Sequence, residues 1–338
     1  EEHKRRCSVQ RIKGDIRCLE SLRAGMPLDC DLYVSEFGEH PGTLNLRIFS
    51  RDKLTLSGEL PVLSHFGFDV IDGYSREVRI PHLPPIDMDN FRFDVRPERI
   101  GQVMGRRKEI IETLREVLAQ RAGDDDLNRL TLVSQLTCRD VEILRAYVAH
   151  LHQLALPFGV DLVRSTLVEY PTVTQAMMSW LAARFDPKVA SDELARASEE
   201  TLESELREVT DYTADRVLSA VAELVRATRR TNAFSMGEPF AFKIATRQLS
   251  FGPEPKPHRE IWVYHTDFEG VHLRGGRVAR GGLRFSDRPE DFRTEIHGLM
   301  ATQMVKNVLI VPMGAKGGFV LRNPPTEREA LREAGDAY

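Results

Sequence analysis

Hydrophobic and polar residues alternate in short runs over the first part of the chain. Segments 30–37 (CDLYVSEF) and 44–49 (LNLRIF) have the period of two, and the β-branched and aromatic residues, that are typical of half-buried strands. A helix is predicted next at 57–66, with Ser57 as its N-cap and Gly67 at its C-terminal end.

The alternation continues after this helix. Strands are predicted at 68–71 and 77–80, joined by a turn at Asp72 and Gly73. Three prolines then interrupt the pattern and indicate a linker: Pro81, Pro84 and Pro85. We therefore interpret residues 1–88 as a small α+β sandwich.

Helical spacing of the apolar residues replaces the alternation from about residue 97 to residue 231. Four segments carry it: 107–120, 136–154, 171–185 and 199–229. Thr137 is the expected N-cap of the second helix. The interval 192–223 holds ten acidic residues and three arginines, which indicates either an acidic docking surface or, as we favour, a solvated helix face. Residues 89–237 are therefore expected to form a mainly helical region.

Strand patterns return after residue 238, and glycine becomes frequent. Segments 240–244 and 260–264 are predicted strands, and 293–308 is a predicted helix. A short buried strand is expected at 309–311, ended by Pro312. Lys316 then falls among glycines, so we expect it in a loop.

The composition narrows the class of protein. Of 338 residues, 41% are apolar and 29% are charged, and the net charge is -4, so the chain is expected to be soluble and to bind neither nucleic acid nor membrane. Four scattered cysteines without a C-x-x-C pair favour reduced thiols in the cytoplasm and no metal site. The first residue is not Met and neither end carries a structural signal, so we expect a piece of a longer protein.

Positive charge is concentrated where glycine is dense. Between Arg280 and Arg322 there are seven Lys or Arg and four Asp or Glu, although the whole chain is acidic. Backbone without side chains beside an excess of cations suits a small substrate with several negative charges. The Walker A loop and the G-x-G-x-x-G fingerprint are both absent from the sequence, so no nucleotide is expected to bind in either of those ways.

Three motifs in this segment carry a family resemblance. They are Arg280-Gly281-Gly282-Leu283-Arg284-Phe285, Gln303-Met304-Val305-Lys306 and Pro312-Met313-Gly314-Ala315-Lys316-Gly317-Gly318. In this order they resemble the substrate-binding region of amino-acid dehydrogenases. Together with residues 286–295 they look like the large bacterial NAD-dependent glutamate dehydrogenases.

The resemblance implies roles for five residues. Lys316 matches the catalytic lysine that activates water, and Lys306 matches the lysine that binds the substrate α-carboxylate. Gln303 matches a neighbour that orients the substrate. Arg280, followed by Gly281 in the same substrate-binding motif, stands where smaller family members have a lysine for the distal carboxylate. A guanidinium can bind that carboxylate in a bidentate manner, so glutamate remains a suitable substrate.

The resemblance also implies an architecture and partners. Residues 1–88 would be an ACT-like α+β module, 89–237 a helical region, and 238–338 the start of an α/β catalytic domain that binds the substrate. The catalytic aspartate and the Rossmann domain that holds NAD would both lie outside this chain, so the chain alone is expected to be inactive. The enzyme would be a cytoplasmic homo-oligomer, a tetramer or hexamer, that acts on L-glutamate and 2-oxoglutarate.

Other interpretations of single residues stay open. Lys316 could be an exposed loop lysine, and Lys306 a cation on a helix surface. Arg284 is expected to pair with Glu295 or Asp287 rather than to contact substrate, and His297 to be packed or exposed rather than a general base. At the level of the whole chain, the rivals are an amino-acid-sensing regulatory protein and an architectural scaffold for assembly.

Overall fold

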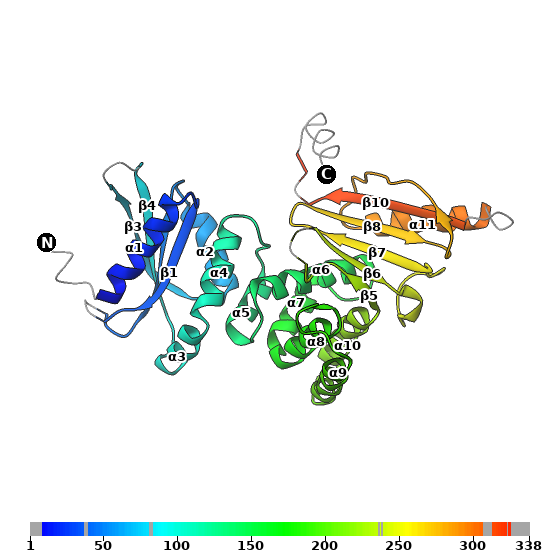
Figure 1. The fold of residues 1–338 in the computed structure, drawn as a ribbon, viewed down its shortest axis with the longest axis horizontal. Helices are drawn as coiled ribbons and strands as arrows, with labels where there is room; N and C mark the ends of the chain where they lie inside the picture. Colours follow the sequence, from blue (N-terminus) through cyan, green and yellow to red (C-terminus); the bar gives the residue numbers. More distant parts are fainter. Residues whose placement is uncertain are drawn as a thin grey trace. The chain divides into compact units, whose positions relative to one another are not determined.

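The computed structural model describes residues 9–36, 40–80, 84–235, 237, 239–306, 313–322 and 324–325. The chain folds into two compact units, Glu1–Val141 and Glu142–Tyr338. Figure 1 shows the elements of both units, coloured along the sequence.

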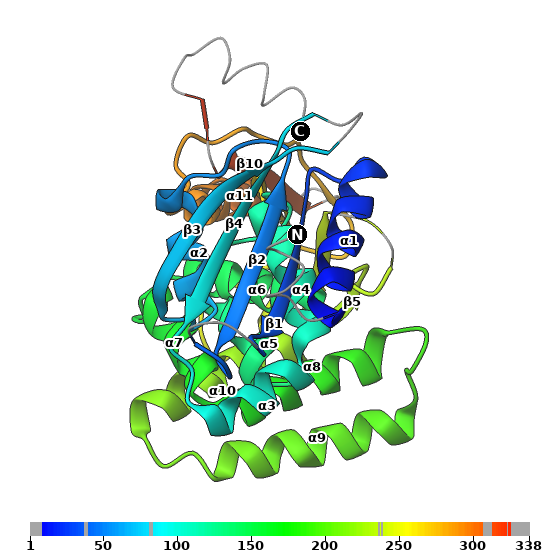
Figure 2. The same cartoon turned by 90° about the vertical axis from the view of Figure 1, so that its left-hand side faces the viewer.

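The first unit is a four-stranded antiparallel sheet with helices on both faces. Its elements are α1 (Val9–Arg23), β1 (Leu28–Val34), β2 (Leu44–Ser50), α2 (Leu56–His65), β3 (Val70–Val78), β4 (Ile86–Phe93), α3 (Pro97–Gly105), α4 (Arg107–Leu118), a 3-10 turn (Asp126–Arg129) and α5 (Leu130–Val133). The strand order is β1-β2-β4-β3. Figure 2 shows the strands in this order, with α1 lying along β1.

Alternation along the strands separates two apolar layers. One layer joins Leu32 and Leu46 to residues of α2 and α4, and the other joins Phe49 and Met88 to residues of α1. Successive side chains of a strand point to opposite faces, so one sheet holds both layers. The strands predicted at 30–37 and 44–49 are confirmed as β1 and β2.

Two local predictions in this unit were wrong. The expected turn at Asp72 and Gly73 lies inside β3, which runs from Val70 to Val78 beside β4, with one register irregularity between Val70 and Asp72. Asp72 pairs with Arg92 across the sheet, and a Cβ at Gly73 would lie 2.9 Å from Phe91 Cδ1. These residues therefore serve strand pairing rather than a turn.

The ends of α2 also differ in part from the prediction. The N-cap is Thr55 and the helix begins at Leu56, so Ser57 lies inside the helix. Gly67 follows the helix with a φ of +79°, as expected of a residue that ends it. Strand β4 runs across residue 88 and continues the sheet to Phe93.

Five helices follow one another from Cys138 to Arg226 among the described residues. They are α6 (Cys138–Gln153), α7 (Val160–Glu169), α8 (Pro171–Phe185), α9 (Asp192–Arg207) and α10 (Tyr212–Arg226). Thr137 is confirmed as the cap of α6, because its hydroxyl accepts the backbone N–H of Asp140 at 3.3 Å. The single helix predicted at 199–229 is wrong. Asp211 accepts the N–H of Ala214 at 2.7 Å and begins a second helix there.

The second sheet holds most of the glycine-rich segment. Its elements are β5 (Thr228–Thr231), β6 (Phe240–Ile244), a 3-10 turn (Thr246–Gln248), β7 (Arg259–Tyr264), β8 (Phe268–Arg274), β9 (Ala279–Arg280), α11 (Phe292–Lys306) and β10 (Met313–Leu321). The order is β5-β6-β7-β8-β10-β9, and among these strands only β9 and β10 pair in parallel. The predicted strands 240–244 and 260–264 and the helix that begins near residue 293 are confirmed, whereas 309–311 lies outside the described residues.

One face of this sheet is covered by two helices. Trp262 of β7 donates a hydrogen bond from Nε1 to the backbone oxygen of Ala146 in α6, at 3.0 Å. A Cβ at Gly318 of β10 would lie 2.4 Å from Ile296 Cδ1 in α11. The register places Trp262 and Gly318 on the same face, each opposite Val271 of β8. Both helices therefore pack on that face, and Figure 1 shows α11 beside β8 and β10.

Candidate functional site

The two motifs that contain glycine lie side by side in space. Strand β9 pairs in parallel with β10, with Arg280 opposite Gly314, and a parallel bridge joins Phe285 to Phe319. Backbone hydrogen bonds connect the stretch between: Gly317 N to Gly282 O at 3.1 Å, Arg284 N to Gly317 O at 3.0 Å, and Phe319 N to Arg284 O at 3.0 Å. The segment after Arg280 therefore continues along the edge of β10 in one unbroken register.

Glycine is required where these backbones and α11 approach one another. A Cβ at Gly281 would lie 1.6 Å from the backbone oxygen of Ala315, which no side chain could tolerate. A Cβ at Gly314 would lie 2.6 Å from Gln303 Cβ. The glycines of the motifs therefore serve close packing of backbone on backbone and of strand on helix.

Lys316 lies in strand β10 and not in a loop, which corrects the expectation from sequence. It is half-buried and pairs with Leu273 of β8. It stands between Gly314 and Gly318, which both face α11, so alternation places Lys316 on that same face. Glycines around a lysine suggested a turn, but here they make room for α11.

Open space lies next to Lys316 on the side where residues 281–285 run along β10. The register brings Gly282 next to it, and a Cβ at Gly282 would meet no heavy atom within 4 Å. Among the residues that the structure describes, none forms a hydrogen bond or ion pair with the Lys316 side chain. The lysine is therefore available to a ligand that enters beside Gly282.

Two other predicted site residues lie near this strand. Gln303 packs against Gly314, two positions before Lys316 on the same face. Arg280 is exposed and is the register partner of Gly314. Lys306 is the last residue of α11, and its side chain lies outside the described part of the structure. The fold thus brings positions 280, 281, 303 and 316 close together. The side chain at 306 is outside the described part of the structure and is not placed here.

A buried ionic cluster fixes the beginning of α11, and sequence reasoning missed it. Glu260 of β7 accepts two hydrogen bonds from Arg293, from Nε at 2.8 Å and from Nη2 at 2.6 Å. His150 of α6 lies 2.7 Å from the same carboxylate through Nε2. All three side chains are at most 1% exposed. No sequence motif links these residues, because they come from three distant segments.

The protonation states in this cluster follow from burial and charge. Burial opposes ionisation of Glu260, but Arg293 and His150 outweigh it and hold the pKa of Glu260 well below its usual range. Burial lowers the pKa of His150, although Glu260 acts in the opposite direction. The ring of His150 also stacks on Trp262, with centroids 4.8 Å apart. The cluster is therefore a neutral histidine beside a paired carboxylate and guanidinium, a structural arrangement rather than an acid–base pair.

Two interpretations of polar residues near α11 are confirmed. Arg284 Nε lies 2.8 Å from Glu295 Oε1, so it is an internal ion-pair partner. His297 is 7% exposed, with Nε2 3.0 Å from the backbone oxygen of Pro255, so it is packed. In the described ranges no group of three or more His, Cys, Asp or Glu side chains could hold a metal ion, and no helix is both long and apolar enough to cross a membrane.

Three family models match successive parts of the chain. Residues 27–103 match the ACT3 domain of glutamate dehydrogenase, and 122–187 match its helical motif 3. Residues 201–338 match the catalytic domain of bacterial NAD-glutamate dehydrogenase.

Curated relatives agree with these matches. The chain is 38% identical over 334 residues to the NAD-specific glutamate dehydrogenase of Halomonas elongata, which covers 96% of this chain and 20% of that protein. It is 34% identical to the Pseudomonas aeruginosa protein of the same name, over 92% of this chain and 20% of that protein. For the Mycobacterium tuberculosis protein of that name the identity is 35%, over 84% of this chain and 19% of the relative.

The three family models define one class, the glutamate dehydrogenases. Within that class, this chain belongs to the bacterial NAD-glutamate dehydrogenase family. It spans about a fifth of the length of the curated relatives that it matches.

Proposed function

We propose that this chain supplies the glutamate-binding half of the active site in an NAD-dependent glutamate dehydrogenase. The reaction converts L-glutamate, NAD and water to 2-oxoglutarate, ammonium, NADH and a proton. The observation that supports it most is the parallel register of the two glycine motifs, which sets Lys316 beside open space under α11. In this proposal the sheet of the first unit, which β4 continues past residue 88 to Phe93, belongs to an ACT-like module. The helices that follow, up to residue 237, form a helical region, and 238–338 form the first part of the catalytic domain.

Each site residue has a proposed role. Lys316 holds and activates the water that attacks the carbon undergoing oxidation. Lys306 binds the α-carboxylate, and Gln303, on the same helix, orients the substrate. Arg280 binds the distal carboxylate at the exposed edge, and Gly281 keeps β9 close to β10. Cations fixed before the reaction stabilise developing charge without reorganisation.

NAD, when bound, accepts the hydride from the α-carbon. A dinucleotide fold places a glycine turn directly at a helix N-terminus. Here α11 begins at Phe292, well after Gly282, so this arrangement does not fit a dinucleotide. We therefore propose that NAD is held elsewhere in the enzyme, and that the enzyme is a cytoplasmic homo-oligomer, a tetramer or hexamer.

The test is Lys316→Ala in the complete enzyme. We expect the initial rate of NADH formation with glutamate to fall on the order of a hundredfold or more, because removal of a preorganised catalytic group has that effect. Lys243→Ala is the matched control, since Lys243 is a half-buried lysine of the same sheet on the face opposite α11. A Lys316→Ala enzyme that turns over like the control would refute the proposal.

A further inference from the structure

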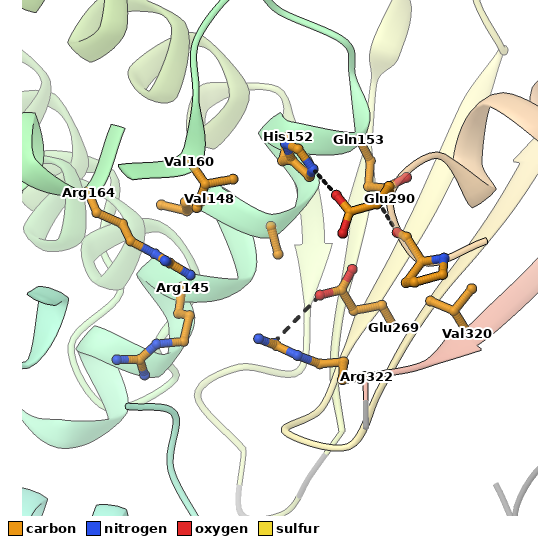
Figure 3. A pocket seen from close by; sticks show the side chains of 12 residues that line it. Arg145, Val148, His152, Gln153, Val160, Arg164, Glu269, Glu290, Val320 and Arg322 are labelled. Atoms are coloured by element: carbon orange, nitrogen blue, oxygen red, sulfur yellow. Dashed lines mark hydrogen bonds and ion pairs between the residues drawn. The ribbon is translucent and has the colours of Figure 1, made fainter. Parts of the chain in front are cut away.

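The two ends of strand β8 differ in how the arginines beside them are compensated. At the end drawn in Figure 3, Arg322 lies 3.6 Å from the carboxylate of Glu269, so the guanidinium has an acidic partner. At the other end, β7 begins at Arg259 and β8 ends at Arg274, and these two arginines are register partners. Directly opposed side chains of neighbouring strands point to the same face of a sheet, so two guanidinium groups of like charge lie side by side there.

Neither arginine of this pair has an acidic partner among the residues that the structure describes. Arg259 donates from Nη1 to the backbone oxygen of His258 at 2.7 Å, and Arg274 donates from Nη2 to the backbone oxygen of Arg277 at 3.0 Å. Both arginines are half-buried, so part of their hydration is lost. Like charges in this position repel each other, and partial burial strengthens the repulsion. A bound anion would remove that repulsion.

Two further arginines lie close to this pair. Arg277 follows β8, and its backbone oxygen accepts the Arg274 side chain. Arg247 belongs to the 3-10 turn, which a 2.9 Å hydrogen bond from Thr246 Oγ1 to the backbone oxygen of Pro257 holds beside the start of β7. Both Arg247 and Arg277 are exposed, and within the described ranges neither forms an ion pair. We call these four residues the arginine cluster.

The ring of His258 responds to the whole arginine cluster. Its backbone N–H donates to the backbone oxygen of Arg274 at 2.7 Å, so it lies where β7 and β8 meet. Partial burial lowers the pKa of His258, and all four arginines of the cluster lower it further. Since the four charges act on one ring, they are close together in space as well as unpaired.

The sheet itself supplies no acid to the pair. Alternation places Arg259 and Arg274 on the face opposite α11, together with Lys243 of β6 and His272 of β8. In the described strands β6, β7, β8 and β10, the positions on this face include no Asp or Glu, whereas the glutamates of β7 and β8 lie on the α11 face. Positive charge is therefore segregated on one face of the sheet.

We propose that the arginine cluster binds a ligand with two or more linked phosphate groups, such as a nucleoside diphosphate or triphosphate. Guanidinium groups bind phosphate oxygens in a bidentate manner, and four of them exceed what a single phosphate requires. They converge on one end of the sheet rather than forming a long stripe, which fits a compact polyanion. The site is separate from the proposed glutamate site, because Lys316 faces α11 and the strand arginines face away from it.

The experiment is calorimetric titration of this chain with inorganic pyrophosphate, inorganic phosphate and ATP in turn, at an ionic strength of about 0.15 M. We expect saturable binding of pyrophosphate, about tenfold or more tighter than that of phosphate. Arg259→Gln or Arg274→Gln should weaken it about tenfold or more, because each removes a charged hydrogen bond. Arg207→Gln is the matched control, since it removes the same charge from a side chain that is 73% exposed on α9. Lys316→Ala should bind as the parent chain does.

The outcomes separate the possibilities. Affinity for pyrophosphate at least equal to that for ATP supports recognition of the phosphate groups alone, and tighter binding of ATP supports a nucleotide ligand. Absence of saturable binding, equal affinity for phosphate and pyrophosphate, or unchanged affinity in both strand variants overturns the proposal. Loss of binding in Lys316→Ala does so as well, because the anion would then occupy the glutamate site. Circular dichroism establishes that the variants fold, and Arg277→Gln, at an exposed position, decides the matter if a strand variant does not fold.

Discussion

Replacing Glu260 by leucine tests how α11 is held on the sheet. The substitution leaves the buried guanidinium of Arg293 without its two carboxylate hydrogen bonds, at 2.8 and 2.6 Å. Removal of one partner from a buried ion pair costs about 3–5 kcal/mol. For a unit of this size, that loss lowers the melting temperature by roughly 6–20 °C.

The assay is urea unfolding followed by tryptophan fluorescence. The sequence has two tryptophans, Trp180 and Trp262, and both lie in the second unit, so the signal reports that unit alone. Trp262 stacks on His150 of the cluster, and its emission should respond directly to loss of this packing. Glu200→Ala, on the exposed surface of α9, serves as a control and should change stability by no more than ~0.5 kcal/mol.

A double variant separates the lost charge pair from lost packing. Glu260→Leu combined with Arg293→Met removes both charges, and replacement of a buried pair by apolar residues is often neutral. We expect the double variant to recover at least ~2 kcal/mol relative to Glu260→Leu alone, as a coupling energy. If the single variant loses less than ~1 kcal/mol, or the double variant recovers nothing, the cluster does not hold α11 as argued.

Two further predictions concern pH and the glycine motif. Because burial lowers the pKa of His150, the unfolded chain binds a proton on this histidine at a higher pH than the folded chain does. The free energy of unfolding should therefore be full above the ordinary histidine pKa of about 6.5 and should fall below it. The variant His150→Gln should flatten this slope in urea midpoints measured from pH 7 to pH 5. Gly281→Ala should destabilise the second unit by at least ~2 kcal/mol, because its Cβ would overlap the Ala315 oxygen. Gly282→Ala, with open space at its Cβ, should fold normally yet raise the KM for glutamate in the complete enzyme; equal stability losses in both variants would contradict the assigned packing.

Local periodicity was sufficient for the elements whose residues carry their own pattern. The two strands at 30–37 and 44–49, the helix at 107–120 and the helix begun by Thr137 needed only side-chain alternation or helical spacing and a cap. The order of the three motifs was enough to indicate the family, because order along the chain is a property of sequence alone.

Tertiary structure decided what the glycines and the isolated charges do. Asp72 and Gly73 have the residue types of a turn, but they lie in strand β3 because they pair with β4. Lys316 lies in strand β10 rather than in a loop, because the glycines around it allow α11 to pack there. Likewise, Glu260, His150 and Arg293 meet only when β7, α6 and α11 come together. A glycine is compatible with a turn and also with a close approach of another backbone or helix. A charged side chain is compatible with exposure to solvent and also with burial beside a partner of opposite charge. The sequence leaves such choices open, and long-range packing makes them.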